Sequence, residues 1–252
     1  MRKELVLCFE NESLDGSTIV DIFRAFVKFN PVRITKGSKT KDWNEKKDIK
    51  TMISDTRSTR FFIQDEEWNH FSVGNLGNSS KCRCVHITNE ISIKNMPDEI
   101  IYSFAMRKGF IAAYLLNADY AHVQSTKFSN NYEGLGYSKE ILDSVNETPW
   151  VKEMWGGKEF NILFNPGRSI LLDSTWLMVG WKMWFGEGVF HLIPQNKILS
   201  FPHAIETKEL SNGIVYVQLF EKLEEPYTPD AVLRQWQWRE WMDYDGLEKK
   251  YG

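Results

Sequence analysis

The sequence predicts an α+β fold, mainly an antiparallel sheet with a few flanking helices, in one compact unit or two intimate lobes. Three observations support this prediction. Short β-prone runs are separated by clusters of turn-forming residues. Segments 18–30 and 229–243 carry the spacing and capping signals of helices. Asn212-Gly213 stands between two β-prone runs, and this dipeptide is a strong hairpin signal.

The first 50 residues predict a strand, a helix and a loop. Residues 4–10 form a short apolar run ended by polar residues, as in a buried strand. Residues 18–30 place their apolar side chains on one half of a helical wheel, with Asp15 or Ser17 as the expected cap and Pro31 as the end. Residues 31–50 predict a solvated, mobile loop, with a basic patch for an acidic partner as the alternative. Its basic residues are Arg33, Lys36, Lys39, Lys41, Lys46, Lys47 and Lys50.

The middle of the chain predicts more strands and a helix. Residues 60–93 contain several short β-prone runs, with turn residues at 74–78. Pro97 opens a helix that Gly109 ends. Residues 110–124 predict a strand, with a helix as the alternative. Residues 125–149, with a short helix at 138–145, mark the expected seam between an N-terminal α+β lobe, 1–125, and a C-terminal antiparallel β lobe, 126–252.

The second half predicts mostly antiparallel strands followed by a terminal helix. Runs 170–185 and 189–193 flank Gly186-Glu187-Gly188, which suggests a hairpin. Runs 204–210 and 214–221 flank Ser211-Asn212-Gly213, which predicts a second one. The helix at 229–243 has Thr228 as its expected cap.

Composition excludes several classes of partner. The chain has 252 residues, a net charge of −3 and a pI near 6.0, which argues against nucleic acid as the main partner. No apolar stretch approaches the roughly 20 residues of a membrane span. Three cysteines are a poor disulfide framework and suit a reducing compartment, so we expect a cytoplasmic protein.

The strongest metal-like pattern is Cys82, Cys84 and His86, which alternate on one face of a strand. Same-face neighbours lie about 6.5–7 Å apart along a strand, so three in a row cannot converge on one zinc ion without a bend. The alternative is two buried cysteines and a hydrogen-bonded histidine. We therefore expect no structural metal and no cofactor.

Catalytic signatures are weak. The sequence has no HExxH, GxSxG, GxGxxG or GxxxxGK[ST] motif. Glu206 and Lys208 resemble a metal-dependent nuclease pattern, but a solvent-facing edge of a hairpin is the favoured interpretation. A site built from dispersed acidic residues stays open as an alternative.

The terminal helix has two apolar sides. Val232, Leu233 and Trp236 occupy one side. The nearly opposite side carries Ala231, Trp238, Trp241 and Met242. A helix with two apolar sides is either covered twice or offers one side to a partner.

The last third of the chain resembles a known class of protein. The segments concerned are Ser174-Thr175-Trp176 to Phe185-Gly186, Phe190 to Pro194, Leu199-Ser200-Phe201-Pro202, Val215 to Phe220 and the Trp-rich terminal helix. They resemble small bacterial immunity proteins of polymorphic-toxin loci. The resemblance implies a protein that binds one cognate toxin and blocks it, and it assigns no catalytic residue.

These observations together predict a cytoplasmic protein-binding protein of the immunity type. The expected binding residues are Trp238, Trp241, Met242, Asp243 and Asp245, because aromatic residues edged by carboxylates suit a basic partner. The alternatives are a metal-dependent hydrolase or nuclease with dispersed acidic residues and a structural or phage-derived assembly protein.

Overall fold

A computed structural model describes residues 2–54, 60–75, 81–88, 97–132, 134–145, 147–154 and 157–252. Within these residues, one antiparallel sheet of ten strands crosses the molecule. In spatial order its strands are β13 (Glu206–Glu209), β14 (Val215–Gln218), β12 (Lys182–Phe185), β7 (Phe110–Asn117), β1 (Lys3–Glu10), β6 (Cys82–Thr88), β5 (His70–Asn75), β4 (Phe61–Gln64), β2 (Arg33–Lys36) and β3 (Lys39–Asp42). Two further antiparallel pairs are β8 (Trp150–Met154) with β9 (Gly157–Phe160) and β10 (Ile170–Leu171) with β11 (Trp176–Leu177).

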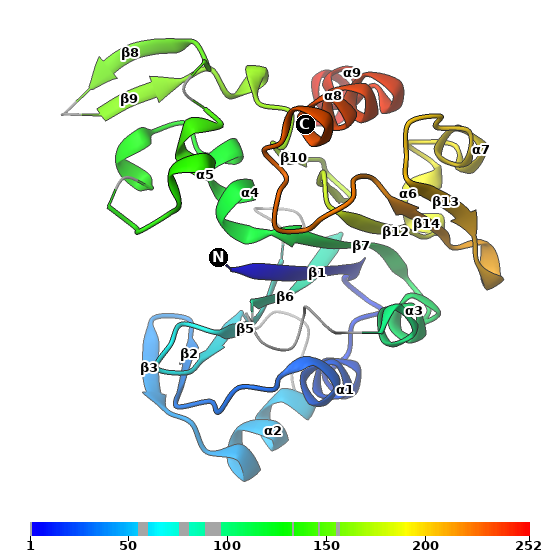
Figure 1. Ribbon diagram of the computed structural model, residues 1–252. Coiled ribbons are helices and arrows are strands. Elements are labelled where there is room, and N and C mark those ends of the chain that lie inside the picture. Colours follow the sequence, from blue (N-terminus) through cyan, green and yellow to red (C-terminus); the bar gives the residue numbers. More distant parts are fainter. Residues whose placement is uncertain are drawn as a thin grey trace.

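Helices cover both faces of the large sheet (Figure 1). On one face lie α1 (Gly16–Phe26), α2 (Glu45–Ile53) and α3 (Asp98–Ala105). On the other face lie α4 (Ala118–Ser125), α6 (Glu187–Phe190), α7 (Gln195–Leu199), α8 (Pro229–Met242) and α9 (Tyr244–Tyr251), with α5 (Lys139–Asp143) beside α4. The expected α+β class with an antiparallel sheet is confirmed.

The central strand β1 divides the core in two. Leu5, Leu7 and Phe9 pack toward α1 and α3, whereas Val6 and Cys8 pack toward α8 and α9. Since both faces are buried, the strand is apolar at nearly every position rather than at every second one. The expected buried strand at 4–10 is confirmed.

The helix expected at 18–30 forms as α1, but it is shorter. Asp15 is its cap and accepts a hydrogen bond from the backbone N–H of Thr18. Phe26 is its last residue, and Val27 already has an extended backbone. The helix therefore ends before Pro31, whose ring excludes the helical conformation only from the residue next to it.

The prediction of a loop at 31–50 is wrong. The segment forms β2, β3 and α2, and β3 is the outermost strand of the sheet. All four residues of β3, Lys39 to Asp42, are exposed. A charged edge strand resists pairing with another chain, and its polar sequence looks like that of a loop.

Two later predictions also need correction. The strand expected at 110–124 ends at Asn117, whose side chain caps α4 by accepting from the N–H of Tyr120, so the helical alternative holds from residue 118 on. The hairpin expected around 186–188 does not form, because Gly186 to Phe190 turn into α6. Gly188 is required there, since a Cβ would lie 2.8 Å from the Ile111 side chain.

The second predicted hairpin is confirmed. β13 and β14 pair antiparallel, and Ser211–Gly213 connect them. Asn212 and Gly213 have φ angles of 58° and 72°, the left-handed values that Asn and Gly tolerate best. The short helix expected at 138–145 is present as α5, and the terminal helix as α8, followed by the unforeseen α9. Residues 89–96, which include one expected strand, lie outside the described residues.

The two expected lobes share the large sheet. β7, from the first half, pairs with β12, from the second, through four residue pairs. The segment between them carries α4, α5 and the β8–β9 pair around a small cluster of Tyr120, Val123, Tyr132, Ile141 and Val145. In the part of the chain described, no helix combines the length and apolar character needed to cross a membrane.

The sheet also contains a half-buried histidine with a shifted pKa. His70 lies opposite Thr88, and its Nε2 is 3.1 Å from Thr88 Oγ1. Burial is the main cause that lowers the pKa of His70 below 6.5. Below pH 6.5 the unfolded chain therefore takes up a proton that the folded protein binds less readily.

We therefore expect stability to fall as the pH drops below about 6.5, with a slope of at most about 1.4 kcal/mol per pH unit from this one group. His70→Gln should flatten that part of the profile. Urea unfolding at pH 7.5 and 5.5 measures the effect, with His203→Gln, at an exposed position, as the matched variant. An unchanged slope in His70→Gln would contradict this assignment.

Candidate functional site

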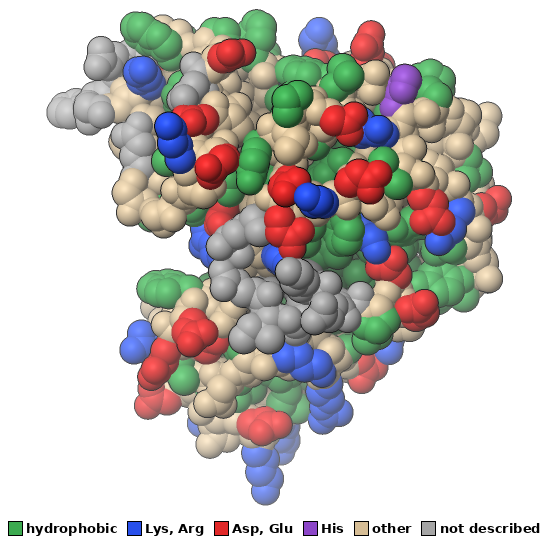
Figure 2. Space-filling view, in the orientation of Figure 1, with side chains coloured by type: hydrophobic (Ala, Val, Ile, Leu, Met, Phe, Trp, Pro, Cys, Tyr) green, Lys and Arg blue, Asp and Glu red, His purple; other side chains and the backbone are tan. Residues whose placement is uncertain are grey.

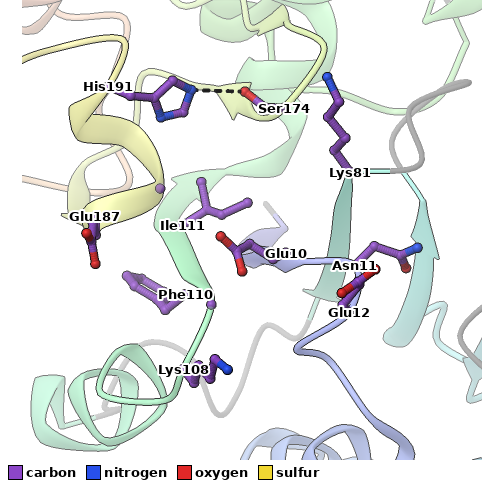
Figure 3. Close-up of a pocket in the computed structure, with 12 residues that line it drawn as sticks. Glu10, Asn11, Glu12, Lys81, Lys108, Phe110, Ile111, Ser174, Glu187 and His191 are labelled. Atoms are coloured by element: carbon purple, nitrogen blue, oxygen red, sulfur yellow. Dashed lines mark hydrogen bonds between the residues drawn. The ribbon is translucent and has the colours of Figure 1, made fainter.

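A polar cleft of about 820 Å³ lies at one end of the central strands (Figure 3). Its walls come from the end of β1, the residue before β6, the start of β7, α6 and the turn at Ser174. The ionisable side chains that line it are Glu10, Glu12, Lys81, Lys108, Glu187 and His191. Because β1 runs antiparallel to both β6 and β7, the end of β1 meets the beginnings of its two neighbours.

A tight backbone turn shapes the floor of this cleft. The N–H of Glu10 donates to the carbonyl of Gly109 at 2.7 Å. Gly109 has φ +72°, and a Cβ there would lie 2.1 Å from Ser13 Oγ. Glycine is therefore required at this position, which in turn holds the carboxylate-bearing end of β1 against β7.

The cleft contains one Ser–His pair. Ser174 Oγ and His191 Nε2 are 3.4 Å apart (Figure 3), and His191 directly follows α6, the helix that carries Glu187. A serine nucleophile also needs a group that orients the imidazole. Among the described residues, none hydrogen-bonds His191 Nδ1. The pair therefore lacks the orienting group of a nucleophile site. The arrangement suits binding of a polar ligand.

Three thiols lie in the core close to the cleft. Cys8 on β1 is directly opposite Cys84 on β6, and Glu10 is opposite Cys82. The Sγ atoms of Cys8 and Cys84 are 2.6 Å apart, those of Cys82 and Cys84 are 3.9 Å apart, and all three lie within 4.8 Å of one another. Burial raises the pKa of Cys8 and of Cys84. Hydrogen bonds from these two thiols lower the pKa of Cys82 to about 5.

His86 does not belong to this cluster. Its Nδ1 is 2.9 Å from Glu4 Oε1, and its ring lies 5.3 Å from that of Trp176. Cys82, Cys84 and His86 therefore do not converge, as the sequence argument expected, and the third group near the two thiols is Cys8, from the neighbouring strand. The sequence argument against convergence considered one strand alone, so it could not include this residue.

Glu206 and Lys208 form an ion pair on the exposed edge strand β13. Lys208 Nζ donates to Glu206 Oε1 at 2.9 Å, and both side chains are nearly half exposed. The position is the solvent-facing hairpin edge that the sequence favoured.

Two residues of the expected binding face are buried. Trp238 and Met242 are 0% and 1% exposed. The Trp238 ring packs against Phe185 and Phe201, and its Nε1 donates to Tyr244 Oη at 3.0 Å. The expected placement of these two residues on an exposed face is therefore wrong, because their side of α8 covers the sheet and α9.

The other expected binding residues have mixed positions. Trp241 is 39% exposed, and its Nε1 donates to the carbonyl of Lys197. Asp243 is exposed at the left-handed junction between α8 and α9. Asp245 is bonded to the buried guanidinium groups of Arg168 and Arg239. Asp245 therefore has a structural role in the fold.

The side of α8 opposite the expected binding residues is exposed. Leu233 is 55% and Trp236 is 36% exposed. Leu233 lines a groove of about 550 Å³ together with Ile205, Asp230 and Glu221. We call Ile205, Leu233, Trp236 and Trp241 the α8 outer surface. Of these residues, the sequence placed Trp241 on the expected binding side of the helix and Leu233 and Trp236 on the opposite side.

The basic residues expected to form a patch gather at the far end of the molecule. Figure 2 shows Lys and Arg side chains clustered where α1 and α2 lie. Lys46, Lys47 and Lys50 are on α2, and Lys41 on β3 pairs with Asp48. This basic end is thus built on regular structure well apart from α8.

Comparisons of the chain with models of protein families, with curated proteins and with solved structures gave no match. The site must therefore be interpreted from its own chemistry.

Proposed function

We propose that this protein binds another protein and blocks it, as an immunity protein does with its cognate toxin. The observation that carries the proposal is the α8 outer surface, where four large apolar side chains are each more than a third exposed. Large apolar side chains left exposed on and beside one helix are typical of a protein interface.

The charges beside this surface favour a basic partner. Asp230 and Glu221 line the groove, and Glu240 is exposed one helical turn after Trp236. The positive charge of Arg234 is partly offset by Asp230, whose carboxylate accepts a hydrogen bond from Arg234 Nε at 2.8 Å. Carboxylates around an apolar centre steer a positively charged partner and leave the burial of the centre to supply affinity.

Co-expression with the product of a neighbouring gene tests the proposal. We expect the two proteins to copurify in equal amounts and the toxicity of the neighbour to be suppressed. If no neighbouring protein binds and the purified protein hydrolyses nucleic acid or a phosphoester with Mg²⁺, the proposal is wrong.

Two exposed leucines allow a matched test of the surface. Leu233 on α8 is 55% exposed, and Leu163, in the turn Ile162–Phe164, is 53% exposed. We expect Leu233→Asp to weaken binding by about 30-fold or more, since a hot-spot residue contributes about 2 kcal/mol. Leu163→Asp should leave affinity unchanged, and both variants should melt close to the parent. Calorimetric titration gives the affinities; the reverse pattern would move the interface to Leu163.

The cleft supports one second candidate, a hydrolase. Glu10, Glu12 and Glu187 line it together with Ser174 and His191, and carboxylates can hold a metal ion that activates water. Glu10→Gln and Glu187→Gln should abolish any Mg²⁺-dependent phosphoester hydrolysis while leaving partner binding intact. Hydrolysis that survives both substitutions would exclude this candidate.

A further inference from the structure

We propose that Cys8, Cys82 and Cys84 form a binding site for a soft divalent cation, with Zn²⁺ as the ion to test. The site is independent of the α8 outer surface. Three sulfurs from two adjacent strands converge within 4.8 Å of one another, and no thiol exposes more than 1% of its surface. Thiolate sulfur is the ligand that zinc and other soft ions prefer.

The spacing suits one shared ion. Two sulfurs bound to zinc at about 2.3 Å lie about 3.8 Å apart at the tetrahedral angle. Cys82 and Cys84 already stand at 3.9 Å. Cys8 and Cys84, at 2.6 Å, have to open by about 1 Å, which a rotation about the Cα–Cβ bond of one thiol supplies. A disulfide would use two of the sulfurs, whereas an ion uses all three.

Tyr114 lies beside the thiol cluster. It is fully buried on β7, and the polar group next to its hydroxyl is the backbone of Met178. Cys8 pairs with Ala112, so Tyr114 is its diagonal cross-strand neighbour on the same face.

Zinc with three thiolates has one position left, and an oxygen donor at Tyr114 or a water bound there completes it. A thiol binds zinc as the thiolate, so uptake of the ion releases protons. Affinity therefore falls as the pH is lowered.

The test uses the full chain, purified with a reductant and stripped with a chelator. Zn²⁺ is titrated against a chromophoric chelator, and Co²⁺ serves as a spectroscopic probe of thiolate ligation. We expect one equivalent of Zn²⁺ per chain and an intense sulfur-to-cobalt charge-transfer band. Since loss of an outer-shell partner alone costs about 10–100-fold, each Cys→Ser variant should lose at least about 100-fold in affinity, and Tyr114→Phe about tenfold.

His203→Asn, at an exposed position, is the control and should bind as tightly as the parent. If a serine variant fails to fold, the unmodified protein still decides, because bound Zn²⁺ should protect all three thiols from alkylation. The proposal is overturned if no ion binds, if Cys8→Ser binds as well as the parent, or if only one thiol is free and mass spectrometry finds a peptide cross-link two hydrogens lighter.

Discussion

Trp238→Ala is expected to lower the free energy of unfolding by about 3–5 kcal/mol, the cost of deleting a large buried aromatic side chain. Trp238 is fully buried between Phe185 and Phe201. Its removal leaves a cavity and also takes the indole donor away from Tyr244 Oη, which itself donates to the carbonyl of Met178 at 3.1 Å. The loss therefore reaches α9 and the turn before β12.

Trp236→Ala is the matched control, two residues earlier on the same helix. Trp236 is 36% exposed, so its removal should cost less than about 1 kcal/mol. Urea unfolding followed by circular dichroism measures both variants, and equal m-values show that the same surface is exposed in each. If Trp238→Ala were as stable as Trp236→Ala, α8 would not cover the sheet with this side.

The helical wheel identifies both apolar sides of α8 but does not show which of them is buried. The buried side contains Gln235 and Arg239 as well as Trp238, which makes it look amphipathic. Gln235 accepts a hydrogen bond from the hydroxyl of Tyr120 and donates one to the carbonyl of Pro226. Neither partner belongs to α8. A polar residue that is paired through the fold looks like a surface residue in the sequence, so the sequence did not show that this side is the buried one.

The sequence failed to predict the thiol cluster for a different reason. Its sequence signal, Cys82 and Cys84 at alternate positions, identified a shared strand face. The third member depends on the register between β1 and β6, in which Cys8 falls opposite Cys84. Register between strands so far apart in the chain is set by burial of both faces rather than by a local motif. By contrast, the β13–β14 hairpin was predictable because Asn212 and Gly213 specify it locally.

Asp245→Asn combined with Glu248→Gln is expected to destabilise the protein by about 3–5 kcal/mol, the cost of leaving a buried charge without its partner. Arg168 is 1% exposed and donates to both Glu248 oxygens, at 3.1 and 2.8 Å, and to Asp245 at 2.9 Å. Arg239, also buried, donates to the same Asp245 oxygen at 2.8 Å. Burial and then the charge of Arg168 lower the pKa of Arg239, while Asp245 raises it, so the carboxylates hold two mutually repelling guanidinium groups together.

The control is Asp173→Asn, which breaks an ion pair with Lys81 whose side chains are 63% and 62% exposed. An exposed pair contributes at most about 1 kcal/mol and is screened by salt, whereas the buried cluster is screened much less. In urea unfolding, a higher salt concentration should therefore reduce the destabilisation caused by Asp173→Asn. It should leave most of the destabilisation caused by Asp245→Asn with Glu248→Gln. Adding Arg168→Met to the double variant should recover part of the loss, because it removes the charge that the substitutions left unpaired. If Arg168→Met deepens the loss instead, the packing of the arginine stem, rather than its charge, holds α9 against the turn at 165–169.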